Sequence, residues 1–206
     1  DAPPLFFERE AAGLRALAAA GARVPEVLEV DARGIVLAWV EPGPGRTTAS
    51  EEAFGRELAA LHGTTGARYG SVDGEPTAYL GACEVDLTPT DTWHESWVQR
   101  RVVPLARRAA DEGRLDAATA VLAERIGPEA LGPVEPPTLL HGDLWGGNRL
   151  VDRVGDSWLV DPCAHLGHRE VDLAMMQLFG GFGGRAYAAY VEAAPLAPGW
   201  QERTAV

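Results

Sequence analysis

The apolar residues near the start of the chain first follow the spacing of a helix and then that of short strands. Between residues 5 and 20 they recur about every 3.6 positions among Glu and Arg, which predicts an amphipathic helix that ends at Gly21. Two apolar runs, 27–30 and 35–40, flank a short connection that contains Gly34. This pattern predicts a β-hairpin, and a hairpin needs further packing partners to be stable.

The remainder of the chain shows mainly helical periodicity. A Gly- and Pro-rich stretch at residues 41–45 interrupts the pattern and marks the boundary that we expect between two lobes, near residue 42. Residues 63–89 are rich in Gly, Thr and Asp and are predicted to be loop. Helices are predicted at residues 50–62, 92–112, 115–126, 170–179 and 184–194.

Two further segments have the character of strands. Residues 138–140 form a short apolar run, and residues 149–152 and 157–160 form a predicted second hairpin. Together the elements predict an α+β fold of two lobes. Residues 1–42 supply a small lobe of one helix, the first hairpin and a connecting segment, and residues 43–206 supply a larger, mainly helical lobe.

The charge of the chain argues against two classes of partner. The 206 residues contain 18 Lys or Arg and 30 Asp or Glu, which gives a formal net charge of −12. Nucleic acids and anionic membrane surfaces attract basic proteins, so neither is expected to bind here. All 18 basic residues are Arg, so these residues cannot complete any chemistry that needs a lysine.

Cysteine usage and hydropathy indicate a cytoplasmic protein. Cys83 and Cys163 lie far apart and suggest neither a disulfide framework nor a cysteine-based zinc site. No apolar run approaches the roughly 20 residues that cross a bilayer, and residues 1–4 lack the features of a signal peptide. The sequence gives no indication of the oligomeric state.

Residues 141–148, with the sequence His-Gly-Asp-Leu-Trp-Gly-Gly-Asn, carry the candidate chemistry. Phosphoryl transfer needs a base aligned with the attacking hydroxyl and oxygen ligands that hold Mg²⁺ against the nucleotide phosphates. Asp143, Asn148 and the later Asp161 have the order and spacing of these groups in a kinase catalytic loop. The alternative is that Asp143 and Asn148 only cap a turn that Gly146 and Gly147 permit.

Several segments together resemble the fructosamine kinase (ketosamine 3-kinase) family, which belongs with the aminoglycoside and choline phosphotransferases to the protein-kinase-like superfamily. The similar segments are residues 139–148, 161–162, 167–175 and 179–182. Trp145 is the most diagnostic position, because aminoglycoside kinases usually carry His-Pro in this part of the loop. The resemblance implies a two-lobe protein-kinase-like fold and the use of ATP and Mg²⁺.

The resemblance also implies roles for individual residues. Asp143 would be the catalytic base, and Asn148 and Asp161 would be the magnesium ligands. Glu10 matches the helix glutamate that pairs with the ATP-binding lysine of the family. The nucleotide contacts that the resemblance assigns to the hinge are the backbone groups of Ala38, Trp39 and Val40.

Two candidate substrate residues each have a second interpretation. Trp145 would stack on the face of a sugar or would act as a hydrophobic plug that fixes the loop. His168 would line the substrate cleft with Arg169, unless Arg169 forms an ion pair with Glu170 or Asp172. The resemblance assigns Asp172 to bracing the catalytic loop. The Gly-rich residues 179–184 follow a predicted helix, so they indicate a helix break and not a phosphate cradle.

The implied activity is ATP-dependent phosphorylation of the 3-hydroxyl of a ketosamine, either a small molecule or an adduct on a protein amine. One alternative is a small-molecule phosphotransferase of the aminoglycoside or choline kinase type. Another is a non-catalytic kinase fragment, because the family's phosphate loop and strand lysine would lie upstream of Asp1 and its later helices beyond Val206. The expectation is therefore an incomplete N-terminal lobe and a C-terminal lobe that is truncated at its end.

Overall fold

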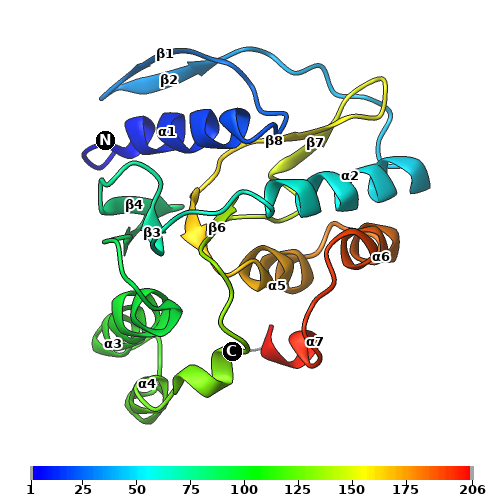
Figure 1. The fold of residues 1–206 in the computed structure, drawn as a ribbon. Helices are drawn as coiled ribbons and strands as arrows, with labels where there is room; N and C mark the ends of the chain where they lie inside the picture. Colours follow the sequence, from blue (N-terminus) through cyan, green and yellow to red (C-terminus); the bar gives the residue numbers. More distant parts are fainter. Residues whose placement is uncertain (1, 205–206) are drawn as a thin grey trace.

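The computed structural model describes residues 2–204 and contains both helices and strands (Figure 1). The helices are α1 (Phe6–Ala19), α2 (Thr48–Leu61), α3 (Val103–Asp111), α4 (Ala117–Ala123), α5 (Glu170–Phe179), α6 (Gly184–Ala193) and α7 (Trp200–Arg203). A π-helix, η1 (Glu95–Val102), and a 3₁₀ helix, η2 (Pro128–Leu131), are also present. The strands are β1 (Val27–Asp31), β2 (Gly34–Leu37), β3 (Gly70–Ser71), β4 (Thr77–Leu80), β5 (Cys83–Asp86), β6 (Thr138–Leu140), β7 (Arg149–Val151), β8 (Ser157–Leu159) and β9 (His165–Gly167).

The N-terminal helix and hairpin form as the pattern predicts. Leu14 and Leu17 are buried on one side of α1, and the chain leaves the helix at Gly21, whose φ of +88° favours glycine. Strands β1 and β2 pair antiparallel, with Val30 opposite Ile35. Strand β2 ends at Leu37, so the predicted extension of this strand to residue 40 is wrong.

Helix α2 begins earlier than its apolar pattern indicates. The Thr47 hydroxyl accepts a hydrogen bond from the Ser50 backbone N–H at 3.1 Å, and the Thr47 N–H donates to the Ser50 hydroxyl at 2.8 Å. This capping box satisfies backbone donors that a helix start otherwise leaves unpaired. Thr47 is therefore the N-cap, and the predicted start at Ser50 is late by two residues.

The prediction that residues 63–89 are loop is wrong, because β3, β4 and β5 lie within them. Strands β4 and β5 form a hairpin whose turn contains Gly81, with a φ of +57°. Its Tyr79 hydroxyl donates to the Pro4 carbonyl at 3.0 Å, and the Tyr79 ring packs on Phe6 with 5.4 Å between centroids. These contacts with the start of α1 are distant in sequence, so the local glycine-rich composition gave no sign of them.

A three-stranded sheet of order β3-β9-β6 leads into the candidate catalytic loop. Strand β9 pairs antiparallel with β6, with Leu140 opposite His165. The pattern did not predict β9, which is only 3 residues long and contains a His and a Gly. The second predicted hairpin is confirmed by β7 and β8, with Arg149 opposite Leu159.

The helices of the second half also differ in detail from the prediction. The segment predicted as one helix at residues 92–112 consists of the π-helix η1 followed directly by α3, with Pro104 in the first turn of α3. A π-helix adds a residue to the turn, and hydrophobic spacing alone does not reveal it. Helix α4 is shorter than the predicted 115–126. Helices α5 and α6 form where they are expected.

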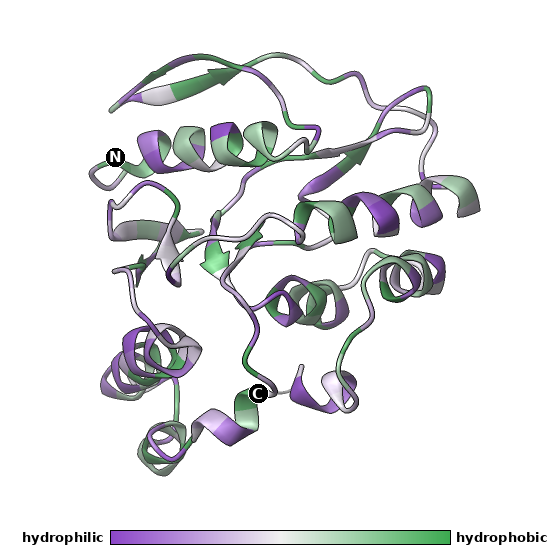
Figure 2. Cartoon of the chain, viewed as in Figure 1, coloured by the Kyte–Doolittle hydropathy of each residue, from purple (hydrophilic) through white to green (hydrophobic). Residues whose placement is uncertain are grey.

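One hydrophobic cluster joins the first helix to the later ones. Leu17 of α1 packs in the same buried cluster as Phe54 of α2, Leu144 of the candidate loop, Leu173 of α5 and Tyr190 of α6. Figure 2 shows hydrophilic and hydrophobic segments alternating along α1 and α2, as expected for helices with one buried face. The division into lobes at residue 42 stays a prediction.

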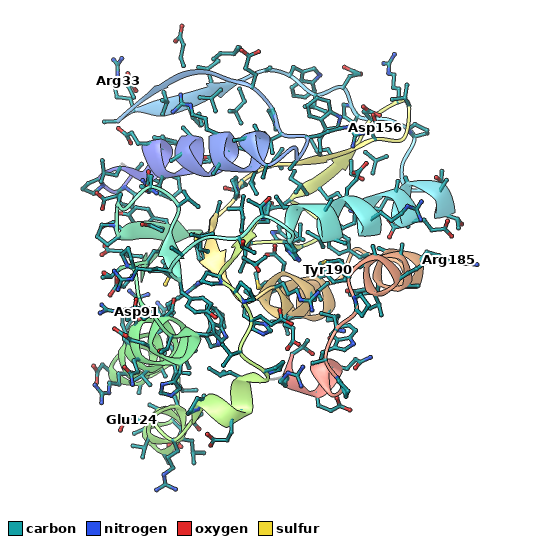
Figure 3. The ribbon with its side chains drawn as sticks, in the orientation of Figure 1. Arg33, Asp91, Glu124, Asp156, Arg185 and Tyr190 are labelled. Atoms are coloured by element: carbon teal, nitrogen blue, oxygen red, sulfur yellow. The ribbon has the colours of Figure 1, made fainter. Side chains whose placement is uncertain are left out.

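The charged surface lies outside this cluster. Figure 3 shows Arg33, Asp91, Glu124, Asp156 and Arg185 at the periphery and Tyr190 in the interior. Over residues 2–204, none of the helices is both long enough and apolar enough to cross a membrane.

Candidate active site

The first residues of the loop between β6 and β7 are held by the segment that follows β8. The imidazole of His141 is fully buried, and its Nε2 lies 3.0 Å from the Val160 carbonyl. Burial lowers the pKa of His141, so the ring is neutral, donates from Nε2 and accepts the Asp143 backbone N–H at Nδ1. Gly142 has a φ of +81°, and a Cβ there would collide with the Cys163 carbonyl.

Asp172 braces this loop from α5. Its Oδ2 accepts the His141 backbone N–H at 2.8 Å, and its Oδ1 accepts the Gly142 N–H at 2.8 Å. His62 Nε2 lies 3.2 Å from the same carboxylate. Burial alone would raise the pKa of Asp172, but hydrogen bonds from His62 and the loop N–H groups outweigh it and hold the pKa low. The predicted bracing contact is present in the structure.

The structure brings the predicted base and the predicted magnesium ligands together. Asn148 Nδ2 donates to the Asp143 carbonyl at 2.9 Å, to Asp143 Oδ2 at 3.1 Å and to the Asp161 carbonyl at 3.3 Å. Asp161 adopts the left-handed conformation, with a φ of +52°, which is uncommon for a residue other than glycine. One amide group therefore joins the catalytic loop to the segment that follows β8.

Asp161 repels two other carboxylates, Asp143 and Glu10. Burial, and then repulsion from Asp161, raise the pKa of Asp143, and the same two causes raise the pKa of Glu10 on α1. Glu10 and Asp161 line a cavity of about 30 Å³ together with Arg9. The Arg9 guanidinium is already paired with Asp73 at 2.6 Å. Within residues 2–204, no ion pair to an Arg or His involves Glu10, Asp143 or Asp161.

The predicted hinge lies between β2 and the Gly- and Pro-rich stretch. The Ala38 N–H donates to the Glu26 carbonyl at 2.8 Å, which fixes the chain just after β2. The Trp39 side chain is 81% exposed, and its indole N–H donates to Glu41 at 3.0 Å. The nucleotide contacts expected of Ala38, Trp39 and Val40 stay a prediction.

The contacts of Trp145 support its interpretation as a side chain that fixes the loop. Its ring lies against Gly147, where a Cβ would collide with the indole, so the side chain does cover the loop backbone. The same side chain is 42% exposed and leaves one part of the indole open to a ligand. Its role toward a substrate stays a prediction.

The Gly-rich segment after α5 supports the loop and is a helix break, as expected. Helix α5 ends at Phe179, and Gly180 follows with a φ of +73°. The Gly180 carbonyl accepts the Gly146 N–H at 3.0 Å. Gly146 and Gly181 pack closely, because a Cβ on either glycine would collide with the Cα of the other. Arg46 donates to the carbonyls of Gly146, at 2.6 Å, and Gly181.

A buried ion pair behind this segment was not predicted from the sequence. The fully buried Arg149 side chain follows Asn148 and donates to Glu51 Oε1 at 2.6 Å and to the Ser50 carbonyl at 3.0 Å. The second Glu51 oxygen accepts the Gly183 N–H at 2.7 Å. The available signal was an Arg in an otherwise apolar strand, which is expected to be buried only with a partner.

A second buried network reaches the loop from η1. Burial, and then the Arg101 charge, lower the pKa of His165 to about 3, so this imidazole is neutral. Its Nδ1–H donates to the Cys163 carbonyl at 2.8 Å, and its Nε2 accepts from Arg101 at 2.8 Å. Gly142 packs against the Cys163 carbonyl, so the network of Arg101 and His165 fixes the backbone against which the catalytic loop packs.

The structure does not bring His168 to the cluster of Asp143, Asn148 and Asp161. It lies after β9 and lines a separate cavity of about 390 Å³ with Trp93, Trp97 and Met175. Its substrate role stays a prediction without support from these contacts.

The suggested ion pair of Arg169 with Glu170 or Asp172 is wrong. Arg169 pairs with Glu135 at 2.7 Å, whereas Glu170 pairs with Arg203 at 2.7 Å. The partners are distant in sequence, and local charge spacing could not identify them.

Replacing Gly142 with Ala tests the tight packing of the loop. We expect a loss of stability and of activity, because the added carbon would meet the Cys163 carbonyl and the backbone is left-handed. Gly113→Ala is the matched control, since Gly113 has a φ of +71° but none of the described residues lies within 4 Å of the added carbon. Equal shifts in the urea midpoint for the two variants would contradict the packing argument.

The sequence model of the fructosamine kinase family matches residues 2–206. The chain belongs to this family. A protein of Thermus thermophilus named as a ketoamine kinase is 42% identical over 202 residues, which cover 95% of this chain and 70% of that protein. The chloroplastic protein-ribulosamine 3-kinase of Oryza sativa subsp. japonica is 32% identical over 214 residues, with coverage of 97% and 60%.

Solved structures of this and related families share the fold. A crystal structure from Thermobifida fusca, named as a fructosamine-3-kinase, has a TM-score of 0.88 and 40% identity and covers 99% of this chain and 71% of that chain. The macrolide 2′-phosphotransferase type I has a TM-score of 0.62 at 18% identity, over 97% of this chain and 68% of its own, so the likeness extends to the fold alone. The expected kinase-like phosphotransferase fold is confirmed.

Proposed function

We propose that this member of the fructosamine kinase family transfers a phosphoryl group from ATP to the 3-hydroxyl of a ketosamine. The observation that carries the proposal is the cluster in which the Asn148 amide joins Asp143 to Asp161. The names of the relatives, ketoamine kinase and protein-ribulosamine 3-kinase, support the same acceptor class.

Asp143 is the proposed catalytic base. The Asn148 amide holds one oxygen of its carboxylate, and the other oxygen has no hydrogen bond from the described residues. Its raised pKa makes it a stronger base than an exposed aspartate, provided that it is deprotonated at the working pH. It would take the proton of the 3-hydroxyl as that oxygen attacks phosphorus.

The residues present fit a magnesium ion bound with the nucleotide. Asp161 repels both Glu10 and Asp143, and a divalent cation beside Asp161 would relieve this repulsion. The described residues contain no group of three or more His, Cys, Asp or Glu that could hold a metal by themselves. Mg²⁺ is usually held by one or two carboxylates together with substrate phosphates and water, so Asp161 and the Asn148 oxygen are the proposed ligands.

Bound ATP with Mg²⁺ would supply the phosphoryl group and neutralise part of the charge that develops during transfer. The hinge backbone at Ala38, Trp39 and Val40 would hold the adenine. Glu10 would pair with the ATP-binding lysine of the family and so orient that lysine toward the phosphates. Trp145 is the proposed sugar-facing residue. The free thiols of Cys83 and Cys163 fit the cytoplasm, where we place the protein.

Asp161→Asn should weaken magnesium-nucleotide binding more than it weakens binding of the acceptor. The change removes a charged ligand while it keeps the size of the side chain, so a higher magnesium concentration should be needed for half-maximal activity. Asp111→Asn is the control, because Asp111 is exposed at the end of α3. An unaltered magnesium dependence in Asp161→Asn would remove Asp161 from the metal site.

The proposed function is tested with a panel of acceptors and ATP·Mg²⁺. We expect phosphorylation of fructosamine or ribulosamine adducts, with the phosphate on the 3-oxygen by ³¹P NMR, and little turnover of aminoglycosides or choline. Preference for an aminoglycoside or choline would assign the protein to the alternative phosphotransferase class. Absence of ATP turnover with every acceptor would favour the non-catalytic alternative. Small adducts and adducts on protein amines are compared in the same panel.

A further inference from the structure

We propose that Arg46 is an anion-binding residue on the acceptor side of the site and that it recognises the carboxylate of a ketosamine formed on a free amino acid. The acceptor class and the acceptor side of the site rest on the proposed function, whereas the position of Arg46 beside the catalytic loop rests on the contacts described next.

The Arg46 guanidinium is fixed beside the catalytic loop. It donates to the Gly146 carbonyl at 2.6 Å and to the Gly181 carbonyl, and it lies 5.7 Å from the centre of the Phe182 ring. Gly146 is adjacent to Trp145 and three positions after Asp143. The contacts therefore hold a cation next to the part of the loop that would meet the acceptor.

This cation has no carboxylate partner within residues 2–204. Glu51, the acidic residue of the buried ion pair behind this segment, already accepts from Arg149 at 2.6 Å and from the Gly183 N–H at 2.7 Å. Arg149 is fully buried and donates to Glu51, Ser50 and Ser157, so it cannot serve a ligand in place of Arg46. Arg46 itself is exposed, and a guanidinium has more N–H donors than two carbonyls use.

The acceptor chemistry matches this arrangement. A ketosamine on a free amino acid carries its carboxylate one carbon from the amine, only a few bonds from the 3-hydroxyl. The chain has a formal net charge of −12, so an anionic acceptor needs a local cation to bind near Asp143 and Asp161. The planar guanidinium is suited to a carboxylate, with which it forms strong charge-assisted hydrogen bonds. An adduct on a protein lysine lacks a carboxylate at this position.

The test compares two acceptors that differ only in this group, the fructosamine of glycine and that of glycinamide. Arg46→Gln should lower kcat/KM for the glycine adduct roughly 10- to 100-fold more than for the glycinamide adduct, as expected for a lost charge-assisted hydrogen bond. Arg46→Lys should retain part of the preference because it keeps the charge. Arg15→Gln is the matched control and should leave the ratio unchanged, because Arg15 is exposed on α1 and has no ion pair among the described residues.

Equal losses for both acceptors would make Arg46 a support of the loop only and would overturn the proposal. A selective rise in KM for ATP·Mg²⁺ would identify the bound anion as a nucleotide phosphate and would overturn it as well. Calorimetry measures the binding of the two adducts without turnover, so it distinguishes a failure of this proposal from a failure of the proposed function. If neither adduct is phosphorylated, tighter Arg46-dependent binding of the glycine adduct still supports the proposal, and equal binding by the unaltered protein rejects it.

Discussion

Replacing Asp143 with Asn is expected to lower turnover roughly 10²- to 10⁴-fold while ATP·Mg²⁺ affinity changes little, the result typical of losing a general base. The carboxylate is the group that would take the acceptor proton, and an amide of the same size cannot do so. The Asn148 hydrogen bond at 3.1 Å has an acceptor in the variant too, so the loop should keep its shape. Initial rates and nucleotide titrations on the same preparation measure both quantities.

A change in KM for the acceptor, with turnover intact, would contradict the role of Asp143 as a base. Asp111→Asn serves as the control, because it makes the same chemical change at an exposed position of α3. Turnover by the control should match the unaltered protein. A loss shared by both variants would indicate a general effect of the reduced negative charge.

Asp172→Asn should cost about 3 kcal/mol or more of stability and should also disorder the catalytic loop. The buried carboxylate accepts two backbone N–H groups of the loop at 2.8 Å each and contacts His62. An amide offers one acceptor oxygen, and its NH₂ would face a donor, so at least one loop N–H loses its partner. Urea denaturation measures the loss of stability.

The pH dependence provides an internal check on this second variant. The pKa of Asp172 lies below its usual value in the folded protein. Its stabilising contribution is therefore complete above the pKa of the unfolded chain and is lost as the pH falls through the folded value. The difference in the free energy of unfolding between Asp172→Asn and the unaltered protein should become smaller in acid. A difference that grows in acid would contradict the role of Asp172 as a charged brace.

The sequence predicted those parts of the molecule whose signals are local. The helix at α1, the hairpins β1–β2 and β7–β8, and the spacing of Asp143, Asn148 and Asp161 all depend on short-range patterns. These patterns also placed Asp172 on a helix, and the family resemblance supplied its bracing role.

The parts that were missed depend on contacts between distant segments. Strand β9 exists because it lies between β3 and β6, and the β4–β5 hairpin packs on the start of α1. In the sequence, Arg46 is an ordinary polar residue of a loop, and Glu51 is one at a helix start. The fold brings Gly146 and Gly181 beside Arg46. It also brings Arg149 and Gly183 beside Glu51. Periodicity carries no information on such pairings.

The shared hydrophobic cluster has a consequence for how the molecule opens. Leu17 of α1 packs with Phe54, Leu173 and Tyr190, and Gly13 lies against Ala164 beyond the catalytic loop. Separating α1 from the later helices would expose this apolar surface, so α1 should unfold together with α2 and α5 as one cooperative unit. Amide protons in the middle of these three helices should then exchange with solvent at similar rates, through the same global event.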